Sequence, residues 1–380
     1  MIPMKVAIFT PFALPELGAN TMRVESMRAF FESSGIETKV FAPKREENAN
    51  LHGYLRYKNI KEIFQIISKE KFDIVLGTSP PITHSFFALI AAKLNRVPFV
   101  LDIRDPWTYA YEGLGIYKKY DPKLWVYKLL EIISYNLCNR IFVVTSGIQK
   151  IIEGTTLTKS KIVLVPNGTD TSMFFHSLSE GKKMRKELNI AQNAKVCIYA
   201  GAFVQKDVDV MISHIAPVLK KTGTYFLMVS PCGEWEKKEF EKIAKLIDEN
   251  GINDLFRFVN SKKFGFEKLY KYYSAADIGL DPLPQAMQNY CIPVKTYDLM
   301  ACAVPIGAKT HLSSPLAQTI IESKAGFVAQ NWSEFCKKLE AQIKGNNLKV
   351  LSNYALKASK KFERKISNKI ALKELRDLLG

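Results

Sequence analysis

Short apolar runs typical of buried strands alternate with amphipathic helical stretches along most of this chain, and that alternation limits its fold more than any other feature. Parallel strands need long crossover connections, which helices usually supply. The first half therefore predicts a parallel sheet with helices on both faces and right-handed crossovers. Its expected strands are residues 5–9, 38–41, 72–76, 98–103, 140–145 and 161–165, and its expected helices include 21–33, 57–69 and 83–94.

A polar and basic stretch, residues 169–193, interrupts the alternation and predicts a domain boundary. The alternation then restarts, with strands expected at 196–200, 225–229, 256–259 and 278–280 and from residue 304. We therefore predict an α/β fold of two facing, doubly wound, Rossmann-like domains. The expected parts are residues 1–170, residues 171–352 and a helical tail, residues 353–380, that crosses back to the first domain. Ligands of such sheets bind beyond the carboxyl ends of the strands, and two facing sheets would bury one in a cleft.

Charge is the unusual feature of the composition. The chain has 380 residues and a net charge of +17, which predicts attraction to nucleic acid, an acidic membrane surface or phosphorylated small molecules. No apolar run approaches the ~20 residues of a membrane span, and the first residues lack the layout of a signal peptide. The six cysteines form no CxxC pair. We expect a cytosolic protein with reduced thiols.

Residues 277–307 combine a buried strand, a polar proline-bounded loop, a helix and a second buried strand. The loop opens onto the amino end of the helix, where unpaired N–H groups and the dipole favour an anion. Lys295 lies in the first turn, where a cation is unfavourable without another partner, and a phosphate would be one. Asp298 lies one turn further along the same face. The alternative is an ordinary strand–helix unit with a solvated lysine and a capping aspartate.

Four stretches in the same order carry a resemblance to a known family. They are FDIVLGTSPPITHSFFALIAAKLNRVPFVLDIRDPW (72–107), VLVPNGTDTSMF (163–174), YAGAFVQKDVDVMI (199–212) and IPVKTYDLMACAVPIGA (292–308). The chain resembles the GT-B glycosyltransferases, closest to the family 4 enzymes that use nucleotide-sugar donors. The resemblance implies an acceptor-binding first domain and a donor-binding second domain. It also implies a retaining hexosyltransferase that needs no metal and no cofactor, with a UDP- or GDP-linked sugar as its substrate.

The chain departs from that family's pattern at its donor-side positions. Of two glutamates that the family spaces eight residues apart, the second is Asp298 here and the first is Tyr290. Gly201 is followed by Ala202, where the family usually has arginine or asparagine. The second glycine loop is Ser-Pro-Cys-Gly, ending at Gly233, and the amino-terminal glycine pair is Gly18-Ala19. The resemblance implies that these positions bind the donor, and the departures bear on which sugar it carries.

Glycosyl transfer from a nucleotide diphosphate builds negative charge on the leaving phosphate, which catalysis must neutralise. Lys206, after the Gly201 loop, and Lys295 are the candidate cations, with help from backbone N–H groups near Gly201 and at the junction of Pro293 with the helix. The resemblance gives Asp298 a hydrogen bond to the ribose. The alternatives are a solvated Lys206 and a surface Asp298.

On the acceptor side, Asp105 follows an expected strand and precedes a proline. A carboxylate there could accept the proton of the incoming hydroxyl or orient the acceptor. Its alternative role is an ion pair with Arg104 in a structural loop. The string Asp207-Val208-Asp209 is similar to a metal-binding D-x-D motif, but it opens an expected helix, where aspartate caps N–H groups. We predict no catalytic metal.

A segment rich in lysines and aromatic residues, 109–139, suggests a face for a membrane interface and a lipid-linked acceptor. The alternative is an ordinary helix with solvated lysines. We therefore expect a cytoplasmic glycosyltransferase, either free or peripheral at the inner face of the membrane, in cell-surface polysaccharide or glycolipid synthesis. A sugar-nucleotide epimerase with the same two domains and a basic nucleic-acid-binding protein are the alternative functions. The lysines are dispersed and no nucleic-acid-binding motif appears, which disfavours the last.

Overall fold

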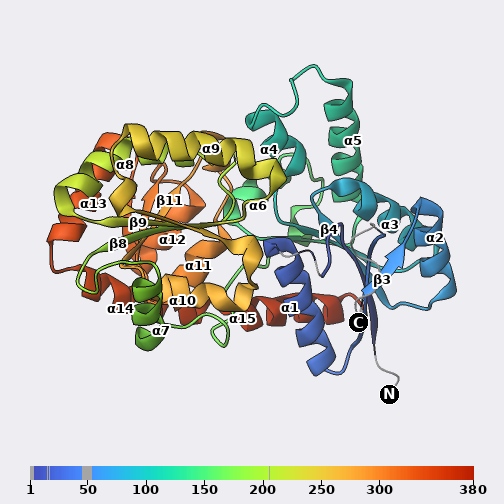
Figure 1. The fold of residues 1–380 in the computed structure, drawn as a ribbon. Helices are drawn as coiled ribbons and strands as arrows, with labels where there is room; N and C mark the ends of the chain where they lie inside the picture. The colour runs from blue at the N-terminus through green and yellow to red at the C-terminus, as the bar shows by residue number, and fades with distance from the viewer. Residues whose placement is uncertain (1–3, 15, 17, 45–53, 205) are drawn as a thin grey trace. The chain divides into compact units, whose positions relative to one another are not determined.

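The computed structural model describes residues 4–14, 16, 18–44, 54–204 and 206–380. The chain forms two compact units, Met1–Asn167 with Arg364–Gly380, and Gly168–Glu363. Each unit is a parallel sheet covered by helices, as the alternating pattern predicts (Figure 1). The sequence pattern placed the corresponding boundaries after residues 170 and 352.

The sheet of the first unit contains, among the described residues, seven strands in the order β3-β2-β1-β4-β5-β6-β7, all paired in parallel. They are β1 (Lys5–Phe9), β2 (Glu37–Pro43), β3 (Tyr54–Tyr57), β4 (Ile74–Ser79), β5 (Phe99–Ile103), β6 (Arg140–Val143) and β7 (Ile162–Leu164). The helices are α1 (Ala19–Ser33), α2 (Ile60–Lys69), α3 (Ile82–Leu94), α4 (Trp107–Gly113), α5 (Pro122–Leu137), α6 (Ser146–Glu153) and α15 (Arg364–Asp377). Strand β3 is not in the sequence-based prediction, which began a helix at residue 57.

The sheet of the second unit has the order β10-β9-β8-β11-β12-β13 and is also parallel throughout the described strands. Its strands are β8 (Val196–Ala200), β9 (Tyr225–Ser230), β10 (Phe256–Asn260), β11 (Ile278–Pro282), β12 (Ile306–Lys309) and β13 (Gly326–Ala329). Its helices are α7 (Leu178–Glu187), α8 (Val208–Thr222), α9 (Glu234–Glu249), α10 (Leu269–Ser274), α11 (Val294–Ala301), α12 (Pro315–Ser323), α13 (Trp332–Lys344) and α14 (Leu348–Ser359). The expected boundary stretch 169–193 thus includes a short helix, α7, which Ser177 caps.

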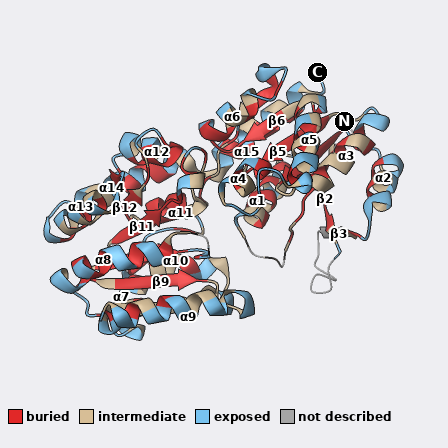
Figure 2. Ribbon diagram, turned by 90° about the horizontal axis from the view of Figure 1, so that it is seen from above, coloured by how far each residue is buried: buried red, intermediate tan, exposed pale blue. Residues whose placement is uncertain are grey.

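Both cores form where the apolar strand residues meet one face of the covering helices. Figure 2 shows buried residues along the strands, whereas α2, α9 and α13 keep exposed outer faces. In the first unit, the helices α1 and α15 pack on the same core as β1, β4 and β5, through Val24, Phe31, Leu372 and Leu375 among others. The predicted tail is therefore two helices with different partners, because α14 belongs to the second unit and only α15 to the first.

In each sheet, successive strands of the chain are first added toward one edge and later toward the other, so the strand order reverses once. In the first unit the reversal lies between β1 and β4, and in the second it lies between β8 and β11. The connections on the two sides of a reversal leave opposite faces of the sheet, so the loops that follow the two strands part and leave a crevice at the carboxyl edge. This topology puts the Gly201 loop, after β8, beside the loop after β11.

A buried ion pair stabilises the end of the first unit's main segment. Arg23 of α1 donates to Asp102 of β5 at 2.7 and 3.0 Å, and also to the carbonyl oxygens of Val165 and Pro166 at 2.9 and 3.1 Å. Both charged side chains are almost fully buried. Arg23 therefore links a helix, a central strand and the residues just before the chain passes into the second unit.

Candidate functional site

Gly201 and Lys295 meet at the reversal point of the second sheet. Gly201 follows β8 with a φ of 114°, a conformation that favours glycine. A Cβ atom there would lie 4.0 Å from Cδ of Lys295, so the lysine side chain passes beside the glycine. The structure thus brings together two predicted site residues that are far apart in the sequence.

Lys295 is held by two groups that come from the neighbouring strands. Its Nζ lies 3.4 Å from Oδ1 of Asp281, at the end of β11, and 3.7 Å from the ring centre of Tyr199, in β8. Asp281 is itself buried and accepts a hydrogen bond from the Thr296 hydroxyl at 2.8 Å. Burial lowers the pKa of Lys295 below its usual range, and the carboxylate of Asp281 opposes that shift.

Asp281 is a functional candidate that the sequence reasoning missed. It supplies the partner that a lysine in the first turn of a helix was expected to need. The available signal was its position: a carboxylate directly after the apolar run Ile278-Gly279-Leu280, at the carboxyl end of a strand. With Asp281 in place, Lys295 is fixed in orientation before any ligand binds.

Lys206 lies near Lys295 but has a weaker partner. Its Nζ lies 3.0 Å from Sδ of Met287, and a thioether sulfur is a weak acceptor that carries no charge. The charge of Lys206 also contributes to lowering the pKa of Lys295, which places the two ammonium groups within electrostatic reach of each other. Two neighbouring cations with one carboxylate leave an excess of positive charge at this edge, which favours an anion.

The N-termini of α11 and α9, both at this edge, differ in how free they are to bind an anion. Helix α11 begins after Pro293, and no side chain in the described part of the chain caps its amino end. By contrast, the N–H of Gly233, before α9, donates to the carboxylate of Glu236 at 2.9 Å, and Lys262 pairs with the same carboxylate at 3.0 Å. The α9 terminus therefore already holds an anion of its own.

The Gly201 N–H itself is occupied by the sheet. The N–H of Gly201 continues the sheet and donates to the carbonyl oxygen of Val229 at 3.0 Å. The expected help from N–H groups near Gly201 therefore falls to other residues of the loop, and it stays a prediction. Ala202 is exposed, and its carbonyl oxygen accepts from the Tyr199 hydroxyl. The loop thus presents Ala202 and Lys206, and not the Gly201 N–H, to a ligand.

Asp298 is buried in α11 and is not the surface aspartate of the alternative interpretation. It lies close enough to Tyr273 and Cys302 to raise the pKa of both groups, a smaller effect there than that of burial. Its predicted bond to a ribose stays a prediction. Two more buried groups at the carboxyl edge are the hydroxyls of Ser230 and Thr310, which find no hydrogen-bond partner within the described part of the chain. Sequence reasoning singled out neither hydroxyl as a site residue.

Asp105 and Gly18 lie in the first unit, at the carboxyl edge of its sheet. Asp105 follows β5, and Gly18 precedes α1, where an added Cβ would meet open space. Arg104 is buried and donates to the carbonyl oxygens of Ser79 and Pro80 at 3.4 and 3.3 Å. Burial lowers the pKa of Arg104 to about 10, and the charges of Asp102 and Asp105 oppose the shift. The charge of Asp105 therefore acts on the buried Arg104. The catalytic role of Asp105 and its alternative, an ion pair with Arg104, both stay predictions.

Within the described ranges, no group of three or more histidine, cysteine, aspartate or glutamate side chains is placed to hold a metal ion. Asp207 does precede α8, but its side chain makes no capping hydrogen bond, contrary to prediction. The six cysteines are free thiols. None of the helices in the described part of the chain has the length and apolar character that crossing a membrane requires.

Comparison with known proteins identifies the class. Two parallel-sheet α/β units with these sheet orders make up the GT-B fold. The chain belongs to the GT-B glycosyltransferases, since residues 5–173 match the model of Glycosyltransferase Family 4 and residues 194–344 match that of Glycosyl transferases group 1. The resemblance inferred from the four motifs is confirmed.

Solved structures show the same fold at low sequence identity. Sucrose-phosphate synthase from Thermosynechococcus elongatus is 14% identical with a TM-score of 0.78, and 99% of each chain is covered. Anabaena HepE in complex with UDP and glucose is 15% identical with a TM-score of 0.77, and 98% of this chain and 100% of that chain are covered. A glycosyltransferase from Rickettsia africae is 14% identical with a TM-score of 0.75, with 100% and 99% covered. None of the curated proteins compared with the sequence matches it.

Proposed function

We propose that this glycosyltransferase moves a hexose from a UDP- or GDP-linked donor to a saccharide or lipid-linked acceptor. The observation that carries the proposal is the pair Lys206 and Lys295, gathered beside Gly201 at the reversal point of the second sheet. HepE, a structural neighbour, has been solved with UDP and with UDP-glucose, which supports a nucleotide-sugar donor.

In the proposed reaction, the bond from the anomeric carbon to the diphosphate breaks and negative charge builds on the leaving phosphate. Lys295, oriented by Asp281, and Lys206, whose hydrogen-bond partner among the described residues is a thioether, would neutralise that charge. Groups held in place beforehand stabilise such charge well, because they need no rearrangement as the bond breaks. The N-terminus of α11 would add its dipole. Two lysines supply the charge that a divalent cation supplies elsewhere, and on this basis we propose a metal-independent reaction without a cofactor.

The remaining assignments rest on the family resemblance. Asp298 would bind the ribose, Gly18 and Gly233 would line the donor site, and Asp105 would orient the acceptor or accept its proton. Retention of configuration and a role in cell-surface polysaccharide or glycolipid synthesis follow from the same resemblance. The proposed cytoplasmic location rests instead on the cysteine pattern of the sequence.

Thermal unfolding with separate ligands tests the donor class. UDP or GDP at about 100 times its dissociation constant is expected to stabilise the protein by about 2.7 kcal/mol, whereas a single-stranded oligonucleotide is not. A panel of nucleotide sugars, followed by product analysis, then identifies the donor through slow hydrolysis or transfer. A new sugar nucleotide formed from the donor alone would identify an epimerase instead, and stabilisation by the oligonucleotide alone would contradict the proposal.

A further inference from the structure

Helix α5 exposes an apolar face on the surface of the first unit. Its outward positions carry large apolar side chains that are 43% to 57% exposed: Trp125, Val126, Leu129, Ile132 and Leu137. Residues three or four positions apart, and those next to them, lie on the same side of an α-helix, so these side chains share one face. Figure 1 shows α5 with α4 and their connecting loop as a hairpin beside the first sheet.

The opposite face of α5 is firmly anchored, so the exposed face is not the result of a loosely placed helix. Leu124 is fully buried, and the buried Glu131 accepts hydrogen bonds from the hydroxyl and N–H of Thr108 in α4. The rings of Trp107 and Tyr127 lie 4.4 Å apart between the two helices. Packing against α4 therefore fixes the orientation in which α5 exposes its apolar face.

The apolar face extends beyond α5. Asn136, near the end of the helix, donates to the carbonyl oxygen of Thr155 at 3.1 Å and accepts from the N–H of Leu157 at 2.9 Å. These bonds hold Leu157, which is 90% exposed, next to the C-terminal end of the face. We call Trp125, Val126, Leu129, Ile132, Leu137 and Leu157 the α5 face.

Exposed lysines lie at the start of the α5 face, and the acids of the hairpin are occupied. Lys118, Lys119 and Lys123 are exposed around the start of the helix. Of the acids in residues 107–137, Glu112 pairs with Lys128 at 2.7 Å, Asp121 caps α5 and Glu131 is buried. The exposed charge at the start of the face is therefore positive.

We propose that the α5 face docks on an anionic membrane surface, with its apolar side chains in the interface and the three lysines on lipid headgroups. An apolar helix face with tryptophan, flanked by lysines, suits the boundary between headgroups and acyl chains. A second copy of this chain fits less well, because a two-fold interface would bring the same lysines together. The proposal deepens the proposed function by placing the enzyme at a lipid surface, but its test does not depend on transfer activity.

Vesicle sedimentation with the full chain tests the surface. Binding to vesicles of 30% phosphatidylglycerol in phosphatidylcholine is expected, with little binding to pure phosphatidylcholine. Each lysine near an anionic surface strengthens binding to the membrane about fivefold. The variant Lys118→Glu/Lys119→Glu should therefore bind vesicles at least about 20-fold more weakly. The variant Trp125→Ser/Leu129→Ser should also lose at least about tenfold. Binding of the unchanged protein should weaken as salt is added.

Matched variants on α9 of the second unit serve as controls. Trp235 is 94% exposed, and Lys237 and Lys238 are exposed beside it. Trp235→Ser makes one of the two apolar changes elsewhere, and Lys237→Glu/Lys238→Glu makes the same two charge reversals. Both should leave vesicle binding within about twofold of the unchanged protein. All variants should keep the circular dichroism spectrum and the cooperative thermal unfolding of the unchanged protein, which shows that they fold.

Equal binding by the α5 variants and the unchanged protein would overturn the proposal. So would a protein that binds no vesicles but forms a dimer that Trp125→Ser/Leu129→Ser dissociates, because the occupant would then be a second copy. If the protein binds vesicles through α5 but neither UDP nor GDP stabilises it, the docking surface is supported and the proposed donor is wrong.

Discussion

Lys295→Met is expected to lower kcat for sugar transfer by about 100- to 1000-fold, the usual cost of removing one preorganised group that stabilises the charge of a transition state. Lys295 lies over the Tyr199 ring and against Asp281, so its ammonium is held in place before the donor binds. The readout is steady-state kinetics with the donor found in the nucleotide-sugar panel, together with the dissociation constant of UDP or GDP.

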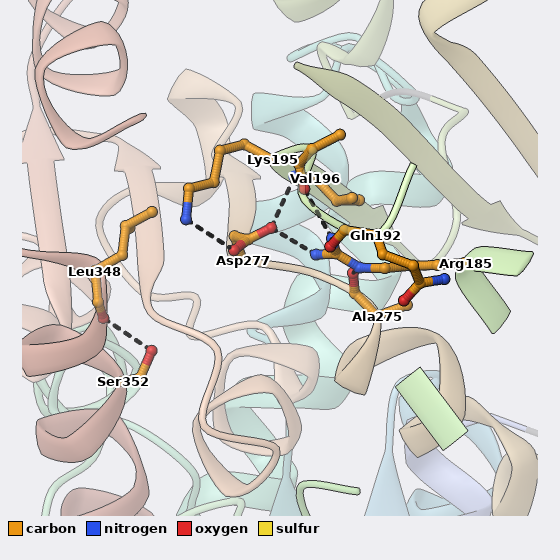
Figure 3. A network of polar contacts seen from close by, with 9 residues as sticks. Arg185, Gln192, Lys195, Val196, Ala275, Asp277, Leu348 and Ser352 are labelled. Carbon is orange, nitrogen blue, oxygen red and sulfur yellow. Dashed lines mark hydrogen bonds and ion pairs between the residues drawn. The ribbon is translucent and has the colours of Figure 1, made fainter. Parts of the chain in front are cut away.

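The same substitution also leaves the buried carboxylate of Asp281 without its cationic partner. Such a loss typically lowers the free energy of unfolding by about 3–5 kcal/mol. The double variant Lys295→Met/Asp281→Asn removes both charges, and we expect it to regain stability but not activity. Lys195 provides a matched control, since it pairs with Asp277 at 3.3 Å at the opposite edge of β8 and β11 (Figure 3). Lys195→Met should keep kcat within about threefold. Full transfer activity in a folded Lys295→Met protein would contradict the assignment.

Arg23→Met is expected to destabilise the protein by about 3–5 kcal/mol, because it leaves the carboxylate of Asp102 buried without its cation. The pair is almost fully shielded from water, and Arg23 also donates to two carbonyl oxygens at the end of the first unit's main segment. Denaturation by urea, followed by circular dichroism, measures the change in the free energy of unfolding.

Arg28, one and a half turns along the same helix, is the control for this prediction. It pairs with Glu25 and Glu32, which are partly exposed to water, and such surface pairs contribute about 0–1 kcal/mol. Arg28→Met should therefore cost less than about 1 kcal/mol. If the two substitutions cost the same, the buried pair is not the anchor that the contacts of Arg23 suggest.

The alternation of strands and helices predicted both sheets because each apolar run is buried on two faces and leaves a clear pattern. Strand β3 escaped prediction since Tyr54–Tyr57 is short and lies at the sheet edge, where fewer apolar residues are needed. The tail was predicted as one helix because α14 and α15 have similar basic, amphipathic patterns. Only their packing partners, in different units, separate them.

The sequence predicted single residues of the candidate site but not which of them lie together. Lys206 and Lys295 follow strand ends within family-like motifs, but which strand ends are neighbours depends on sheet order, which the sequence does not state. Asp281 becomes a partner of Lys295 only because β11 directly precedes the loop and helix that carry the lysine. The occupied N–H of Gly201 and the unpartnered hydroxyls of Ser230 and Thr310 likewise depend on contacts between strands and loops.

The most direct test of the central claim is a crystal structure of the full chain with UDP or GDP bound. We expect the diphosphate beyond the carboxyl ends of β8 and β11, with phosphate oxygens within hydrogen-bond distance of the Nζ atoms of Lys206 and Lys295. A nucleotide bound at any other place, or both ammonium groups turned away from its phosphates, would contradict the account.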